Sequence, residues 1–200
     1  MKKGCIVAII IAAVLILFLL IIVGSGVRTY NRMVTMRESV TSQWGNVETV
    51  YQRRLDLIPN FVNTVKGAAD FEQSTLTQVI EARAKATSVT IDPANMTPEN
   101  MQEFQAAQGA VSSSLGRLMV VVEQYPELRA TQNFRDLQVE LEGTENRISV
   151  ERRSFNEVVL AYNAYIKRFP QNILAGMFSF TERPYFEAIE GAETAPVVTF

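Results

Sequence analysis

Charged side chains gather at a few places along this chain, and they set the range of chemistry that it could perform. Arg53, Arg54 and Asp56 lie within four residues of one another and precede Pro59. Carboxylates are more widely spread, at Glu72, Glu123, Glu142, Glu145 and Glu151. Carboxylates on facing helices of a bundle are the starting point of a di-metal site. A metal site and general acid–base catalysis are therefore the first possibilities to examine.

The chain contains no histidine, and its single cysteine is Cys5. Histidine is the commonest general base near neutral pH and the commonest metal ligand. Di-metal bundle sites combine glutamates with Glu-x-x-His motifs. Ser-His, Cys-His and ordinary zinc sites are excluded, and an intramolecular disulfide cannot form. Only carboxylate or lysine chemistry, or a site for Mg²⁺ or Ca²⁺ with oxygen ligands, would remain. Of these possibilities we favour none, and we predict a protein that is not an enzyme and has no metal or other cofactor.

Two interpretations of the arginine cluster remain open. In the first, Arg53, Arg54 and Asp56 pair across a helical bundle and fix its register, because buried charges persist only when they are paired. The expected partners are Glu123, Glu142 and Glu145. In the second, the same segment, extended to Asn60, docks a partner protein or contacts a phosphate group. We favour the first interpretation.

A run of eighteen residues without a polar side chain, 6–23, stands near the N-terminus. As a helix it would extend roughly 27 Å, close to the thickness of the hydrocarbon core of a bilayer. A cleaved signal peptide is the alternative, since Lys2 and Lys3 precede the run and Gly24-Ser25-Gly26 follows it, but signal peptides have shorter apolar regions. We predict a retained transmembrane anchor that includes Ile6, Ile11, Leu15, Phe18, Leu20 and Val23.

The sequence contains only a weak signal for the side of the membrane on which the bulk of the chain lies. Lys2 and Lys3 lie before the anchor, and Arg28, Arg32 and Arg37 lie after it, so the positive-inside count is nearly balanced. The compact basic N-terminus favours a single-pass protein of the bacterial cytoplasmic (inner) membrane whose bulk is extracytoplasmic.

Beyond the anchor, apolar residues recur every three or four positions, which predicts long helices and no strands. The first series covers 33–79, with Pro59 expected to kink or divide it. A break at 87–100 ends with Thr97 as an N-cap, and the second helix ends or kinks near residues 125–126. The third covers 134–169. We predict an all-α fold: an N-terminal transmembrane helix followed by an elongated antiparallel helical bundle of the four-helix type.

The segment 173–186 is rich in aromatic residues and too apolar for a free linker. It either caps the bundle of its own protomer or forms an assembly patch that contacts a neighbouring subunit or lipid headgroups. The candidate residues of this patch are Met177, Phe178, Phe180, Tyr185 and Phe186. The expected domain organisation is a tail, anchor and Gly-Ser-Gly hinge at 1–26, a bundle at 27–186, and a C-terminal tail at 187–200, whose residues 197–200 are apolar enough to dock.

Two sequence blocks, residues 53–60 and 123–126, and several shorter motifs together resemble those of the LemA family of bacterial membrane-anchored helical proteins. The most specific are Arg-Arg-Leu-Asp-Leu-Ile-Pro-Asn at 53–60 and Glu-Gln-Tyr-Pro at 123–126. Others are Tyr30-Asn31, Trp44, Ala82-Arg83-Ala84, Phe134, Glu145-Asn146-Arg147-Ile148, Phe155-Asn156, Tyr162-Asn163, Phe169-Pro170 and Tyr185-Phe186-Glu187. The resemblance implies an anchor followed by an antiparallel bundle and implies no enzyme activity. Some relatives are associated with membrane shaping and with neighbouring membrane proteases.

The chain has 19 basic and 21 acidic residues and no basic run, which argues against a nucleic-acid partner. The predicted partners are the lipid bilayer and further copies of the same chain. The predicted function is a non-enzymatic membrane-anchored helical scaffold that self-associates at the bacterial cytoplasmic membrane. The alternative is an adaptor that binds a specific membrane protein, such as a protease or a sensor.

Overall fold

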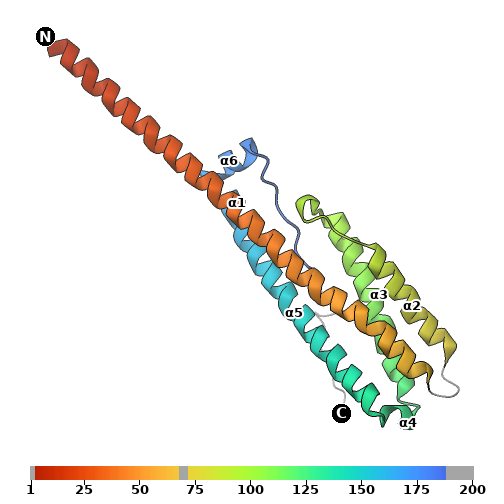
Figure 1. The fold of residues 1–200 in the computed structure, drawn as a ribbon. Helices are drawn as coiled ribbons and strands as arrows, with labels where there is room; N and C mark the ends of the chain where they lie inside the picture. Colours follow the sequence, from red (N-terminus) through yellow and green to blue (C-terminus); the bar gives the residue numbers. More distant parts are fainter. Residues whose placement is uncertain (1–2, 68–71, 188–200) are drawn as a thin grey trace, which may run out of the picture. The chain divides into compact units, whose positions relative to one another are not determined.

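The computed structural model describes residues 3–67 and 72–187 (Figure 1). These residues contain helices and no strands, so the predicted all-α fold class is confirmed. The elements are α1 (Lys3–Lys66), α2 (Gln73–Ser88), the 3₁₀ helix η1 (Pro93–Asn95), α3 (Pro98–Val122), α4 (Pro126–Arg129), α5 (Gln132–Lys167) and α6 (Gln171–Met177).

The N-terminal part of α1 is long and apolar enough to cross a membrane. The large apolar side chains from Ile6 to Val23 are exposed on every side of the helix, Phe18 for example at 61% and Leu20 at 63%. No other part of the described chain covers them. The helix continues through Gly24, Ser25 and Gly26 without a break, so a hinge at these residues stays a prediction.

The chain forms two compact units. The first contains the residues up to Val40 and Leu160–Glu182, and the second contains Thr41–Val159 and the chain from Arg183 onward. Helices α1 and α5 each contribute a segment to both units. The predicted domain boundaries at residues 26 and 186 stay predictions, and residues 188–200, with the proposed docking segment 197–200, lie outside the described chain.

The second unit is a four-helix bundle built from segments of α1, α2, α3 and α5. Gln43 Nε2 donates to Glu151 Oε2 at 2.6 Å, and the rings of Phe61 and Phe134 lie 5.2 Å apart, so α1 and α5 run antiparallel. All four segments and the short α4 contribute to one apolar core that includes Leu55, Ile58, Phe61, Val65, Leu76, Val79, Val111, Leu118, Leu128 and Phe134. The antiparallel bundle predicted from the 3-4 periodicity is therefore present.

Pro59 does not divide α1, which corrects one expectation from the sequence. The helix continues to Lys66 and ends at a turn at Gly67, so the apolar series at 33–79 belongs to two helices, α1 and α2. A proline lacks the N–H that would bond to the carbonyl four residues earlier, here that of Leu55. In this fold Arg83 Nε, from α2, donates to Leu55 O at 2.9 Å. A tertiary hydrogen bond thus satisfies the carbonyl that Pro59 leaves free.

The start of α3 agrees with its sequence signal. Thr97 Oγ1 accepts from the backbone N–H of Asn100 at 3.3 Å, and Asn100 Oδ1 accepts from the N–H of Thr97 at 2.9 Å. These reciprocal bonds form a capping box, with Pro98 at the first helical position. The helix ends at Val122, and Pro126 begins α4, close to the predicted end at residues 125–126.

We predict that Arg83 and Pro59 are energetically coupled. Arg83→Met keeps the apolar stem but leaves Leu55 O without a partner, which should lower the free energy of unfolding by about 1–3 kcal/mol. In a Pro59→Ala background the restored N–H bonds to Leu55 O, and the same change should have a much smaller effect. A double-mutant cycle of chemical denaturation on the full chain in detergent measures the coupling. Equal effects in both backgrounds would contradict this assignment.

Candidate interaction site

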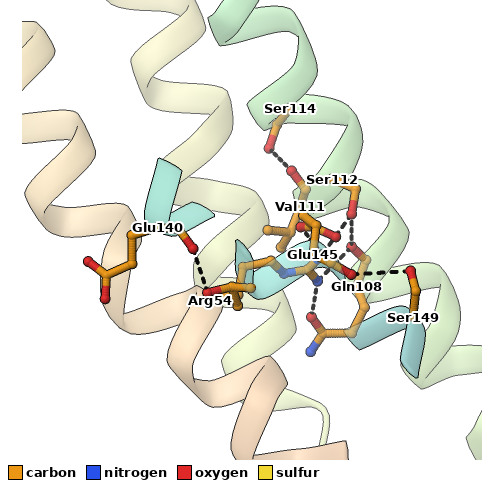
Figure 2. A network of polar contacts seen from close by, with 9 residues as sticks. Arg54, Gln108, Val111, Ser112, Ser114, Glu140, Glu145 and Ser149 are labelled. Atoms are coloured by element: carbon orange, nitrogen blue, oxygen red, sulfur yellow. Dashed lines mark hydrogen bonds and ion pairs between the residues drawn. The ribbon is translucent and has the colours of Figure 1, made fainter. Parts of the chain in front are cut away.

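Arg54 is a buried guanidinium at the meeting point of α1, α3 and α5, and it is 1% exposed. Its Nη1 donates to Ser112 Oγ at 2.7 Å and to Glu145 Oε1 at 2.9 Å. Its Nη2 donates to the backbone carbonyl of Gln108 at 3.1 Å and to the side-chain oxygen of the same residue. Figure 2 shows these side chains pointing toward one another from the three helices. One arginine thus joins three helices of the bundle.

The environment of Arg54 combines one charged partner with neutral acceptors. Glu145 is 40% exposed, so water solvates part of its carboxylate, whereas the guanidinium has no comparable access. Arg54 Nε has no hydrogen-bond partner in the described part of the chain, and the guanidinium lies 5.1 Å from the ring centre of Tyr51. A buried charge of this kind depends on its few partners, and its best-supported role is to specify register.

Burial also raises the pKa of the Tyr51 hydroxyl above its ordinary value. The positive charges of Arg152 and Arg54 oppose this rise, but desolvation of the phenolate is the larger effect. Tyr51 is consequently neutral at physiological pH and acts here as a packing residue beside the guanidinium.

The remaining residues of the predicted cluster are exposed. Arg53 forms an ion pair with Glu140 on the surface of the bundle. Asp56 accepts a hydrogen bond from Gln52 Nε2 at 2.8 Å within α1. Asn60 is exposed and contributes its backbone carbonyl to Thr64. Glu123 lies exposed at the end of α3. The structure thus brings Arg54 and Glu145 together but does not gather all six predicted residues at one site.

Sequence reasoning missed three partners of the arginines, namely Glu140, Gln108 and Ser112. The role of Gln108 could have been predicted, because it is a polar residue on the apolar face of α3, where it is buried with the core residues. A polar residue at such a position needs a hydrogen-bond partner. Glu140 and Ser112 lie on faces that read as ordinary solvated surface, and no local pattern distinguishes them.

A groove of about 550 Å³ lies beside this cluster in the second unit. Segments of α1, α2 and α3 line it, together with the turn that follows α2. Its charged and amide side chains are Glu48, Gln52, Arg53, Asp56 and Gln108. Such a lining suits hydrogen bonds to a polar protein segment. In the described residues no group of three or more acidic or thiol side chains has the arrangement of a metal site.

The predicted assembly patch is divided by the fold. Phe186 is 5% exposed, and its ring packs 6.0 Å from that of Trp44 and 5.4 Å from that of Phe155 in the second unit. Phe180 is also buried, against Tyr30 in the first unit. Met177, Phe178 and Tyr185 are exposed. Two of the five residues therefore belong to the protein's own core and three remain available for contacts.

Comparison with known proteins gives one family match. The model of the LemA family matches residues 43–200 of this chain. This range contains the Arg54 cluster, the helices α2 to α6 and most of the bundle segment of α1.

Three relatives cover most of the chain. Magnetosome protein MamQ 2 of Paramagnetospirillum magneticum is 28% identical over 85% of this chain and 68% of its own length. Magnetosome protein MamQ of Magnetospirillum gryphiswaldense is 26% identical over 94% of this chain and 75% of its own length. Protein LemA of Metamycoplasma hominis is 22% identical, over 88% of this chain and 78% of its own length.

Adjacent arginines provide a matched test of the register role. We predict that Arg54→Ala lowers the free energy of unfolding by about 3–5 kcal/mol, because it breaks a buried charge network. Arg53→Ala, which removes only an exposed ion pair, should change it by less than about 1 kcal/mol. Denaturant unfolding of both variants as full chains in detergent measures the difference. A small effect at both positions would reject the register role.

Proposed function

The chain belongs to the LemA family, and on that premise we propose that it is a non-enzymatic scaffold anchored in the bacterial cytoplasmic membrane. Copies of the chain associate with one another there. The anchor is a single pass, and the bundle faces the extracytoplasmic side.

One observation carries this proposal: the same helix supplies an uncovered apolar segment and the core of a folded bundle. From Ile6 to Val23 the large apolar side chains of α1 are exposed, whereas Trp44, Ile58 and Phe61 on the same helix are 0–1% exposed. An apolar surface of this extent is stable in hydrocarbon and not in water. A bundle held at the bilayer by its own core helix suits a structural task.

Self-association is supported by the physics of anchoring and by the surface of the bundle. Confinement to a membrane raises the effective concentration of neighbouring copies, so weak lateral contacts become sufficient. In the second unit Val120, Val139 and Val150 each expose more than half of their side chains.

A second candidate function is favoured by the groove beside Arg53. Its exposed side chains of both signs, Glu48, Arg53 and Asp56, provide a polar docking surface. An adaptor would bind one membrane protein, such as a protease or a sensor, at this groove.

Mixed-isotope cross-linking distinguishes the two candidates. Full chains carrying ¹⁴N or ¹⁵N are co-reconstituted in vesicles at graded protein density and cross-linked through lysines such as Lys66 and Lys85. The scaffold predicts links between differently labelled chains, with dilution in excess detergent as the control that removes them. Links absent at every density would reject self-association. Links in native membranes to one other protein, lost in Arg53→Ala, would favour the adaptor instead.

A further inference from the structure

The first unit carries an exposed apolar surface around α6. Ile173 and Met177 are four residues apart and share one face of this helix. Phe169 lies in the turn before the helix and Phe178 directly follows it. Phe169 is 80% exposed, Ile173 54%, Met177 71% and Phe178 51%. We refer to these four residues as the α6 surface. Single exposed apolar residues are common, but a cluster of four marks a contact site.

The α6 surface lies beside α1 just beyond the apolar run. The Phe178 ring is 4.9 Å from the ring of Tyr30, and the Arg32 guanidinium is 5.3 Å from the ring centre of Tyr165. Tyr165 precedes the α6 surface and Phe178 is its last residue, so the chain contacts α1 both before and after α6. Figure 1 shows α6 beside α1. Tyr30 follows Val23 by seven residues, which is about 10 Å along a helix.

That distance reaches the outer edge of the interfacial layer of a membrane. If the run at 6–23 fills the hydrocarbon core, the polar layer beyond it extends about 5–8 Å, given a total bilayer thickness of about 40–45 Å. Amphipathic helices on a membrane surface bury their apolar faces among the headgroups and the first acyl carbons. The α6 surface therefore lies next to a medium that can cover it, without any second protein.

Basic side chains accompany the same region of the first unit. Arg28 and Arg32 are exposed on α1, and Arg168 is exposed next to Phe169. Lys167 contributes less, because its Nζ pairs with Glu182 Oε2 at 2.6 Å. Exposed arginines beside an apolar surface favour anionic lipid headgroups. The charge of this region is therefore complementary to that of a bacterial membrane surface.

We propose that the α6 surface is a second membrane contact, which rests on the leaflet from which α1 emerges and prefers anionic lipids. Two separated contacts, α1 through the bilayer and α6 on its surface, would restrict the tilt of the first unit. This inference depends on the anchoring of α1 in the proposed function, and it assigns Met177 and Phe178 to lipid and not to a neighbouring subunit.

Lipid quenching tests the proposal on the full chain. In a Cys5→Ser background, Met177→Cys or Ile173→Cys carries an environment-sensitive fluorophore, and the chain is reconstituted in vesicles of phosphatidylglycerol and phosphatidylcholine. Brominated lipids should shift and quench the emission at both positions, and less so in vesicles without phosphatidylglycerol. Val139→Cys is the matched negative control, since Val139 is 69% exposed and lies about 42 Å before the end of α5. Leu15→Cys reports on the anchor.

Each other outcome overturns the inference in a distinguishable way. Quenching at Leu15 without quenching at residues 173 and 177 means that the anchor holds and the α6 surface stays in water. A blue-shifted signal at residue 177 that is insensitive to bromine and is lost on dilution with lipid means that a second copy covers the surface. An absence of quenching at Leu15 as well rejects the anchoring itself.

Discussion

The structure depends on one constraint: the apolar side chains of a single helix, α1, must be covered in two different environments. Along the first part of α1 the apolar side chains point in every direction and the described chain covers none of them. Farther along, the apolar side chains occupy one face and pack into the bundle core with those of α2, α3 and α5. Burial of a large aliphatic or aromatic side chain contributes about 1.5–3 kcal/mol. The bundle obtains this contribution from protein, and the anchor can obtain it only from lipid.

Two arginines connect the helices of the bundle through hydrogen bonds. Arg54 connects α1 to Gln108 and Ser112 of α3 and to Glu145 of α5, while Arg83 of α2 bonds to the Leu55 carbonyl that Pro59 leaves free. Apolar contacts tolerate sliding, whereas these directional bonds are satisfied in one register only. The most specific sequence block of the chain, residues 53–60, therefore supplies contacts between helices of the bundle. Arg53 and Asp56 of the same block are exposed and line the adjoining groove.

The sequence predicted those features that local patterns encode. The apolar run, the N-cap at Thr97, the length of α5 and the pairing of the arginine cluster with one of three glutamates follow from periodicity, cap residues or charge. The continuation of α1 through Pro59 was missed because the compensating donor, Arg83, lies on another helix. The burial of Phe180 and Phe186 agrees with the interpretation that the segment 173–186 packs on its own protomer, but which side chains turn inward could not be predicted, because an irregular segment has no period. In α1 and in the segment 173–186 alike, contacts with residues distant in the sequence determine the structure.

The central claim is that the exposed apolar segment of α1 is held in a bilayer. Alkaline carbonate extraction of membranes from cells that produce the unmodified chain tests it most directly, with the protein quantified in the pellet and in the supernatant. Carbonate removes proteins held by charge or by weak surface contact and leaves those that cross the hydrocarbon core. The account predicts that the full-length chain stays in the pellet. Recovery of the chain in the supernatant would contradict it.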